Sequence, residues 1–115
     1  MADIEPHVVN ALTWFKGKSM TPSQLLVQNR QEILRIVAAH CAAKPRVFGS
    51  VLHGDDTEKS DLDLLVDPLP GATLFDLGGI QIDLEELLGI PVDVLTPGDL
   101  PRKFRQQVLQ EAQAL

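Results

Sequence analysis

Apolar residues recur at helical spacing in several stretches of the chain, with polar residues between them. The pattern predicts one long helix from about residue 21 to 40, a second from 73 to 88 and a third from 100 to 112. Gly78 and Gly79 weaken the second of these predictions, because each glycine costs a helix interior about 1 kcal/mol relative to alanine.

Three shorter apolar runs, bounded by proline, glycine or charged residues, are typical of β-strands: Arg46–Gly49, Leu62–Val66 and Pro91–Leu95. From residue 20 onward, the predicted elements therefore follow the order helix, strand, strand, helix, strand, helix. This order predicts a single α/β domain in which helices cover a small sheet.

Residues 1–19 are expected to form a separate N-terminal extension. They carry a short amphipathic pattern of their own, and Gly17-Lys18-Ser19 breaks it before Met20, which can serve as an alternative start. We therefore predict an extension at residues 1–19 and a domain at residues 20–115. The extension is interpreted either as a helix packed on the domain or as a contact for a partner protein.

Composition narrows the class of protein. The length of 115 residues suits one small domain, and the net charge of −6 disfavours direct nucleic-acid binding through a basic surface. Cys41, the single cysteine, forms no internal disulfide, fits a reducing compartment and is predicted to be a small core residue. Because no apolar run approaches the ~20 residues of a membrane span and no signal peptide is recognisable, we expect a cytoplasmic protein that does not enter a membrane.

Two carboxylates alternate with apolar residues in the second predicted strand. Asp61 and Asp63 lie two positions apart, so they share a face and are separated by about 6.7 Å. At an effective dielectric constant near 20 they repel each other by roughly 2–3 kcal/mol. Leu62, Leu64 and Val66 anchor the opposite face, so a cation is the natural way to relieve this repulsion. Mg²⁺ prefers such carboxylate oxygens together with substrate phosphates.

A glycine-serine turn precedes this carboxylate pair. Gly49-Ser50 ends the first predicted strand, and backbone N–H groups in such a turn can bind a phosphate. Together the turn and the two acids indicate a site for a metal-bound nucleoside triphosphate.

Asp93 is the one acid inside the third predicted strand, where aspartate is disfavoured. If this strand lies beside the second, Asp93 joins Asp61 and Asp63. Three acids on adjacent strands can hold two Mg²⁺ ions about 3.5–4 Å apart, which activate an attacking oxygen and stabilise a leaving pyrophosphate. The alternative is an edge-strand aspartate that faces water.

These residues resemble the nucleotidyltransferase pattern of the DNA polymerase β superfamily. Gly49-Ser50, ten intervening residues, Asp61-Leu62-Asp63 and a later strand aspartate, Asp93, match that pattern. The short length and the residues around these motifs resemble the minimal nucleotidyltransferase (MNT) branch, and within it the antitoxin of HEPN/MNT toxin–antitoxin pairs. The resemblance covers roughly residues 21–115.

The resemblance implies an α/β (α+β) fold with a short mixed sheet of three or four strands flanked by about four helices. It also implies transfer of a nucleotidyl group, usually AMP from ATP, to an acceptor hydroxyl. In the antitoxin relatives the acceptor is a tyrosine of the HEPN toxin, a helical RNase. Carried over to this chain, Gly49 and Ser50 hold the triphosphate, and Asp61, Asp63 and Asp93 are the catalytic ligands of two Mg²⁺ ions.

The sequence departs from the family pattern just after the turn. Many relatives carry an arginine there, whereas this chain has Val51, Leu52 and His53. His53 is a candidate hydrogen-bond donor to a phosphate. The alternative is a structural role or a side chain exposed to water. No residue that binds the nucleotide base can be recognised from the sequence.

Three functions remain open at this stage. The first is a Mg²⁺-dependent protein adenylyltransferase that modifies a HEPN toxin, within a hetero-oligomer. The second is a non-catalytic antitoxin whose charge of −6 suits docking onto a basic RNase. The third is a small-molecule nucleotidyltransferase. Because 115 residues leave no room for a second domain that presents the acceptor, we expect another copy of the chain or a toxin subunit to present it.

Overall fold

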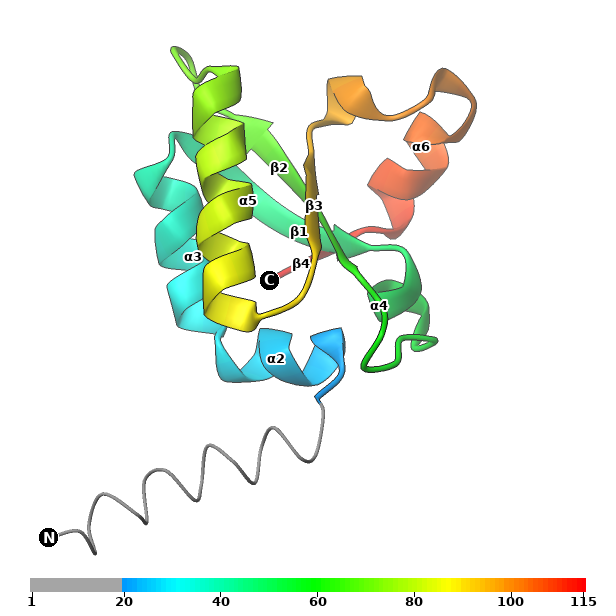
Figure 1. The fold of residues 1–115 in the computed structure, drawn as a ribbon. Helices are drawn as coiled ribbons and strands as arrows, with labels where there is room; N and C mark the ends of the chain where they lie inside the picture. The colour runs from blue at the N-terminus through cyan, green and yellow to red at the C-terminus, as the bar shows by residue number, and fades with distance from the viewer. Residues whose placement is uncertain (1–19) are drawn as a thin grey trace, which may run out of the picture.

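The computed structural model describes residues 20–115 (Figure 1). Its elements follow in the order α2 (Pro22–Gln28), α3 (Arg30–Ala39), β1 (Ala42–Phe48), α4 (Ser50–His53), β2 (Leu62–Pro68), α5 (Leu74–Leu88), β3 (Val92–Leu95), a 3₁₀ turn η1 (Pro97–Asp99), α6 (Arg102–Glu111) and β4 (Gln113–Ala114). The predictions made for residues 1–19, including the domain boundary after them, lie outside the described residues.

The four strands form one mixed sheet in the order β3-β2-β1-β4. β1 pairs antiparallel with β2 and with β4, whereas β2 and β3 run parallel. The parallel pair needs a crossover connection, which α5 supplies. The predicted α/β fold with a short mixed sheet is therefore confirmed.

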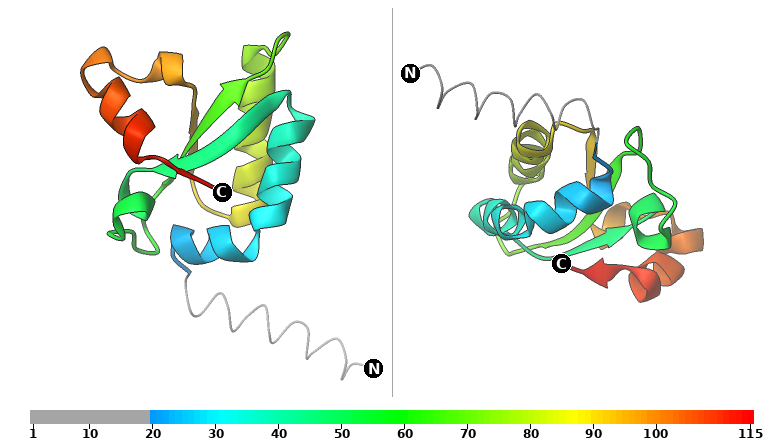
Figure 2. Two further views of the ribbon diagram at one scale, coloured as in Figure 1. Left: turned by 180° about the vertical axis from the view of Figure 1, so that it is seen from behind. Right: turned by 90° about the horizontal axis from the view of Figure 1, so that it is seen from below.

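The two faces of the sheet differ sharply. α3 and α5 cover one face, and α6 lies on the other (Figures 1 and 2). The main core fills the space under α3 and α5, where the side chains of Leu62, Leu64 and Val66 are completely buried. The alternation predicted for β2 is thus present, and it leaves Asp63 and Leu65 on the opposite face.

The first predicted helix is divided in two. Thr21 caps α2, accepting a hydrogen bond from the Gln24 backbone while the Gln24 side chain accepts one from the Thr21 backbone. α2 ends at Gln28 and α3 begins at Arg30. Asn29 lies between them, and its side chain donates to the carbonyl oxygen of Leu25. The prediction of one helix to residue 40 was wrong because Asn29 interrupts the helical geometry.

Cys41 is exposed and is not the core residue that the helical stripe predicted. α3 has ended at Ala39, and Cys41 adopts a φ of 58° in the turn before β1. This left-handed turn takes the side chain off the helical stripe, and Ala42 fills the core instead.

α5 runs without interruption through Gly78-Gly79. A methyl group at Gly79 would lie 2.6 Å from Cε1 of His40, so the ring at the end of α3 occupies the space that a side chain would need. His40 Nε2 lies 2.8 Å from Oδ2 of Asp83 on α5, which fixes the ring there. Gly79 therefore allows the two helices to approach closely. Among residues 20–115, no helix is both long and apolar enough to cross a membrane.

Candidate active site

Gly49 forms the corner between β1 and α4. Its φ of 77° and ψ of −146° lie in a region that essentially only glycine occupies. A Cβ atom at this position would also collide with the carboxylate of Asp63. The glycine-serine turn thus lies directly against an acid of β2, which sequence spacing alone does not establish.

Three side chains form a row across the sheet beside this turn. Phe48 of β1 is paired with Asp63 of β2, and Asp63 is paired with Asp93 of β3. Directly paired residues share a face, and this face is opposite the main core. The structure therefore brings Asp93 beside Asp63.

The charges in this row act on one another. Burial, followed by the nearby carboxylates of Asp93 and Asp61, raises the pKa of Asp63 to about 6. Asp61, just before β2, and Asp93, on β3, are both exposed, and Asp93 has the larger effect on the pKa of Asp63. The row is an accumulation of negative charge that no Lys or Arg among residues 20–115 neutralises through an ion pair.

The loop that leads to Asp61 is tied to the start of α2. Oδ2 of Asp56 accepts hydrogen bonds from the backbone N–H of Ser23 at 2.8 Å and from its hydroxyl at 2.7 Å. Burial alone would raise the pKa of Asp56, but these hydrogen bonds outweigh it and lower the pKa. Sequence patterns gave no indication of this contact, because its partners are 33 residues apart.

The carboxylate chemistry of the three acids suits a metal ion better than the distances between them do. Within residues 20–115, no three His, Cys, Asp or Glu side chains come close enough together to hold a metal ion. Carboxylates are nevertheless the donors that Mg²⁺ prefers. The raised pKa of Asp63 reflects burial first and repulsion from Asp93 and Asp61 second, and a hard cation would offset that repulsion.

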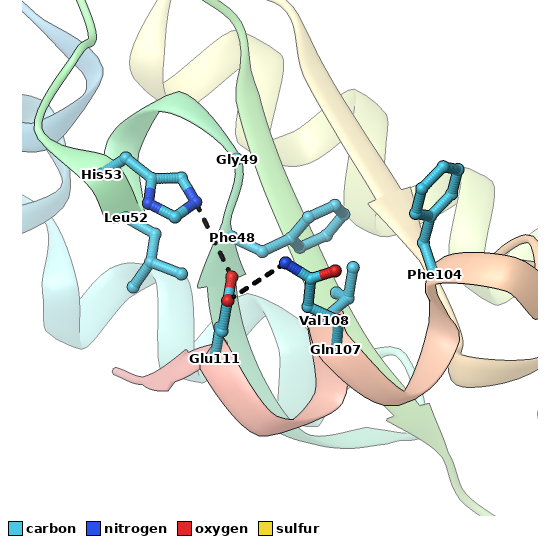
Figure 3. Close-up of a pocket in the computed structure, with 8 residues that line it drawn as sticks. All are labelled: Phe48, Gly49, Leu52, His53, Phe104, Gln107, Val108 and Glu111. Carbon is cyan, nitrogen blue, oxygen red and sulfur yellow. Dashed lines mark hydrogen bonds and ion pairs between the residues drawn. The ribbon is translucent and has the colours of Figure 1, made fainter.

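A pocket of about 310 Å³ opens beside the turn, between the β1–α4 corner and α6 (Figure 3). It is lined by Phe48, Gly49, Leu52, His53, Phe104, Gln107, Val108 and Glu111. His53 lies here, with Nε2 3.8 Å from Oε1 of Glu111. Its predicted contact with a phosphate remains a prediction.

Sequence reasoning missed the side chains that α6 contributes to this pocket. Their spacing of three, four and seven residues from Phe104 was visible only as part of an amphipathic helix. Phe104 is 50% exposed, and no sequence signal distinguishes it from an ordinary residue of the apolar stripe.

A family model described as a nucleotidyltransferase domain matches residues 30–115. The chain belongs to this nucleotidyltransferase family. The matched region contains the Gly49-Ser50 turn, the three acids and all of α6. The family predicted from the motifs is therefore confirmed.

Curated relatives of this nucleotidyltransferase carry the names of protein-modifying enzymes. A candidate protein adenylyltransferase of Methanocaldococcus jannaschii, MJ0435, is 35% identical over 83 residues, covering 72% of this chain and 89% of the relative. The protein adenylyltransferase MntA of Thermococcus cleftensis is 37% identical over 65 residues, which span 56% of this chain and 66% of the relative.

Solved structures share the fold of this nucleotidyltransferase. A structure described as a candidate minimal nucleotidyltransferase matches with a TM-score of 0.73 and 43% identity, covering 81% of this chain and 95% of its own. A crystal structure of a toxin–antitoxin with AMP-PNP matches with a TM-score of 0.63, covering 75% of this chain and 71% of its own. At 19% identity, this second likeness shows the fold alone.

Proposed function

We propose that this nucleotidyltransferase transfers AMP from ATP to a hydroxyl of a protein partner, with a tyrosine of a HEPN-type RNase toxin as the acceptor. The observation that carries the proposal is the Asp63–Asp93 pair in direct register beside the Gly49 corner. The adenylyltransferase names of relatives and the AMP-PNP in the toxin–antitoxin structure support the choice of nucleotide and of a protein acceptor.

In this proposal the Gly49-Ser50 turn holds the triphosphate. Backbone N–H groups of the turn and the Ser50 hydroxyl can donate hydrogen bonds to phosphate oxygens. This places the phosphates next to Asp63, the acid in contact with the turn.

Asp61, Asp63 and Asp93 are the residues that would hold two Mg²⁺ ions. When bound, these ions supply the positive charge that offsets both the triphosphate and the crowded carboxylates. The acids themselves orient the site, because Asp63 and Asp93 are fixed on adjacent strands.

The transfer forms one bond and breaks one. The acceptor oxygen attacks the α-phosphorus of ATP, the bond from that phosphorus to the bridging oxygen of the β-phosphate breaks, and pyrophosphate leaves. Of the two paired acids, Asp93 on β3 is the exposed one, and in this proposal it accepts the proton of the acceptor hydroxyl.

Mass spectrometry tests this function directly. The HEPN partner, incubated with the full chain, ATP and Mg²⁺, should gain the mass of one or more AMP groups, and its Tyr→Phe variant should not. Asp63→Asn should abolish the gain while the protein remains folded by circular dichroism. A partner whose mass stays unchanged with folded wild-type protein would contradict the proposal.

The net charge of −6 favours a second candidate, neutralisation by binding alone. Asp61→Asn/Asp63→Asn separates the two functions. If this variant still inhibits the toxin's RNase activity at stoichiometric concentration, occlusion suffices. If inhibition requires the intact acids and ATP, modification is the cause.

A further inference from the structure

The pocket between the β1–α4 corner and α6 adjoins the acidic site, although none of the three acids lines it. Gly49 lines the pocket and also touches Asp63, and Phe48 lines it while pairing with Asp63 in the sheet. A ligand whose charged end lies at the Gly49-Ser50 turn can therefore extend its other end into this pocket.

The pocket walls suit a flat group with a polar edge. Phe48 and Phe104 lie toward one end and Leu52 and His53 toward the other (Figure 3). Phe104 is half exposed, and the ammonium of Lys103 lies 5.6 Å from its ring centroid. The volume of about 310 Å³ is at the lower end of the range for small-molecule sites, about 300–1,000 Å³.

At the polar edge of the pocket, one carboxylate oxygen is available to accept a hydrogen bond from a ligand. Nε2 of Gln107 donates to Oε2 of Glu111 at 3.2 Å, which orients that carboxylate. Oε1 of Glu111 lies 3.8 Å from His53 Nε2, too far for a hydrogen bond, so it can accept one from a ligand.

We propose that this pocket binds the nucleoside part of ATP, with the base packed against Phe104 and its exocyclic amino group donating to Glu111. The inference rests on the proposed function, because it assumes that the triphosphate lies at Gly49-Ser50. It also assigns base preference to α6. Adenine presents an amino donor where guanine presents a carbonyl acceptor, and a carboxylate attracts the first and repels the second.

Titration calorimetry with two probes tests the pocket apart from the phosphate site. Tripolyphosphate with Mg²⁺ reports the phosphate site, and ATP with Mg²⁺ reports both sites. Wild-type protein should bind ATP more tightly than tripolyphosphate. Phe104→Ala should weaken ATP binding at least about fivefold, since stacking of a base on an aromatic ring is worth about 1–3 kcal/mol, and should leave tripolyphosphate binding unchanged.

Phe75→Ala is the matched control. Phe75 is 92% exposed on α5 and does not line the pocket. It should leave the affinity for both probes unchanged. If Phe104→Ala perturbs folding, Gln107→Ala is the second variant and Gln110→Ala, one turn further on and outside the lining, is its control.

Base preference tests the role of Glu111. Wild-type protein should bind ATP more tightly than GTP, and Glu111→Gln should reduce that ratio at least about fivefold, because an amide can donate to the guanine carbonyl. An unchanged ratio would overturn the role of Glu111.

Equal wild-type affinities for ATP and tripolyphosphate, or unchanged ATP binding in both Phe104→Ala and Gln107→Ala, would overturn the pocket while leaving the phosphate site intact. Failure of wild-type protein to bind either probe would instead overturn the proposed function, and the pocket assignment with it.

Discussion

At the residue scale, Gly49 combines two constraints that a sequence motif does not separate. Its backbone conformation excludes a side chain, and the Asp63 carboxylate occupies the space where a Cβ atom would lie. Gly54, at the other end of α4, also has a positive φ, 73°, but no atom lies within 4 Å of its hypothetical Cβ. The two positions therefore differ both in backbone region and in whether a side chain would collide with a neighbour.

We expect Gly49→Ala to destabilise the protein by more than about 2 kcal/mol, because strain and collision add. Gly54→Ala should cost only about 1 kcal/mol, the ordinary cost of a left-handed residue. Urea unfolding monitored by circular dichroism measures both values. Equal losses for the two variants would show that the collision with Asp63 is unimportant.

Asp63 should make stability depend on pH when no metal ion is present. Its pKa is raised to about 6 in the folded protein, so its protonated form favours folding. This stability is fully present below the unfolded value of 3.8 and is lost as the pH rises through about 6.

Asp63→Asn should therefore stabilise the metal-free protein at pH 7.5 and have little effect near pH 4. Because Asp63 is only half-buried, solvent screening reduces the gain at pH 7.5 to about 1 kcal/mol. Urea unfolding in EDTA at the two pH values measures it. A gain of the same size at both would contradict the electrostatic cause.

At the element scale, two adjacent glycines of α5 play different parts. A side chain at Gly78 would meet no atom within 4 Å, whereas one at Gly79 would meet the His40 ring held by Asp83. Gly78→Ala should stabilise α5 by up to about 1 kcal/mol through helix propensity.

Gly79→Ala should gain nothing or destabilise, because the His40 ring must leave Asp83. Adding His40→Ala to Gly79→Ala should restore the gain, which a double-mutant cycle by thermal unfolding would detect. Additive effects of the two substitutions would mean that the ring and the glycine are not coupled.

The loop before β2 depends on a capping contact from another element. Asp56→Ala removes the acceptor for both hydrogen bonds from Ser23, and we expect a loss of about 1 kcal/mol, as for other helix caps. Asp55→Ala, at the neighbouring exposed position, should change stability by less than about 0.5 kcal/mol.

Hydrogen exchange would locate the effect of Asp56→Ala in α2 and in the loop that carries Asp61. Equal unfolding free energies for the Asp55 and Asp56 variants would show that the cap does not hold the loop.

At the scale of the whole molecule, the main core covers one face of the sheet, whereas the other face carries both buried apolar side chains and the acids of the candidate active site. Leu65 and Leu100 are buried but lie outside the main core cluster, and β2 contacts η1. Leu65 lies on the same face of β2 as Asp63, and the contact of β2 with η1 holds the segment that leads into α6 against the sheet.

Leu65→Ala and Leu64→Ala test this division. Both side chains are completely buried, so each variant should lose about 2–5 kcal/mol of stability. Hydrogen exchange should show protection lost first in η1 and α6 for Leu65→Ala, and across α3 and α5 for Leu64→Ala. The same pattern in both variants would mean that the two faces of the sheet do not act separately.

The sequence by itself determined the alternation of β2, the position of the Gly49-Ser50 turn and the family to which the chain belongs. These features are local, because side-chain direction along a strand and the conformation of a glycine follow from neighbouring residues. Only the tertiary structure decided which strands pair, and therefore that Asp93 lies beside Asp63. The break at Asn29, the Asp56–Ser23 cap and the α6 wall of the pocket were likewise beyond prediction. The cap and the wall join residues far apart in the chain, and the break has no glycine or proline to mark it.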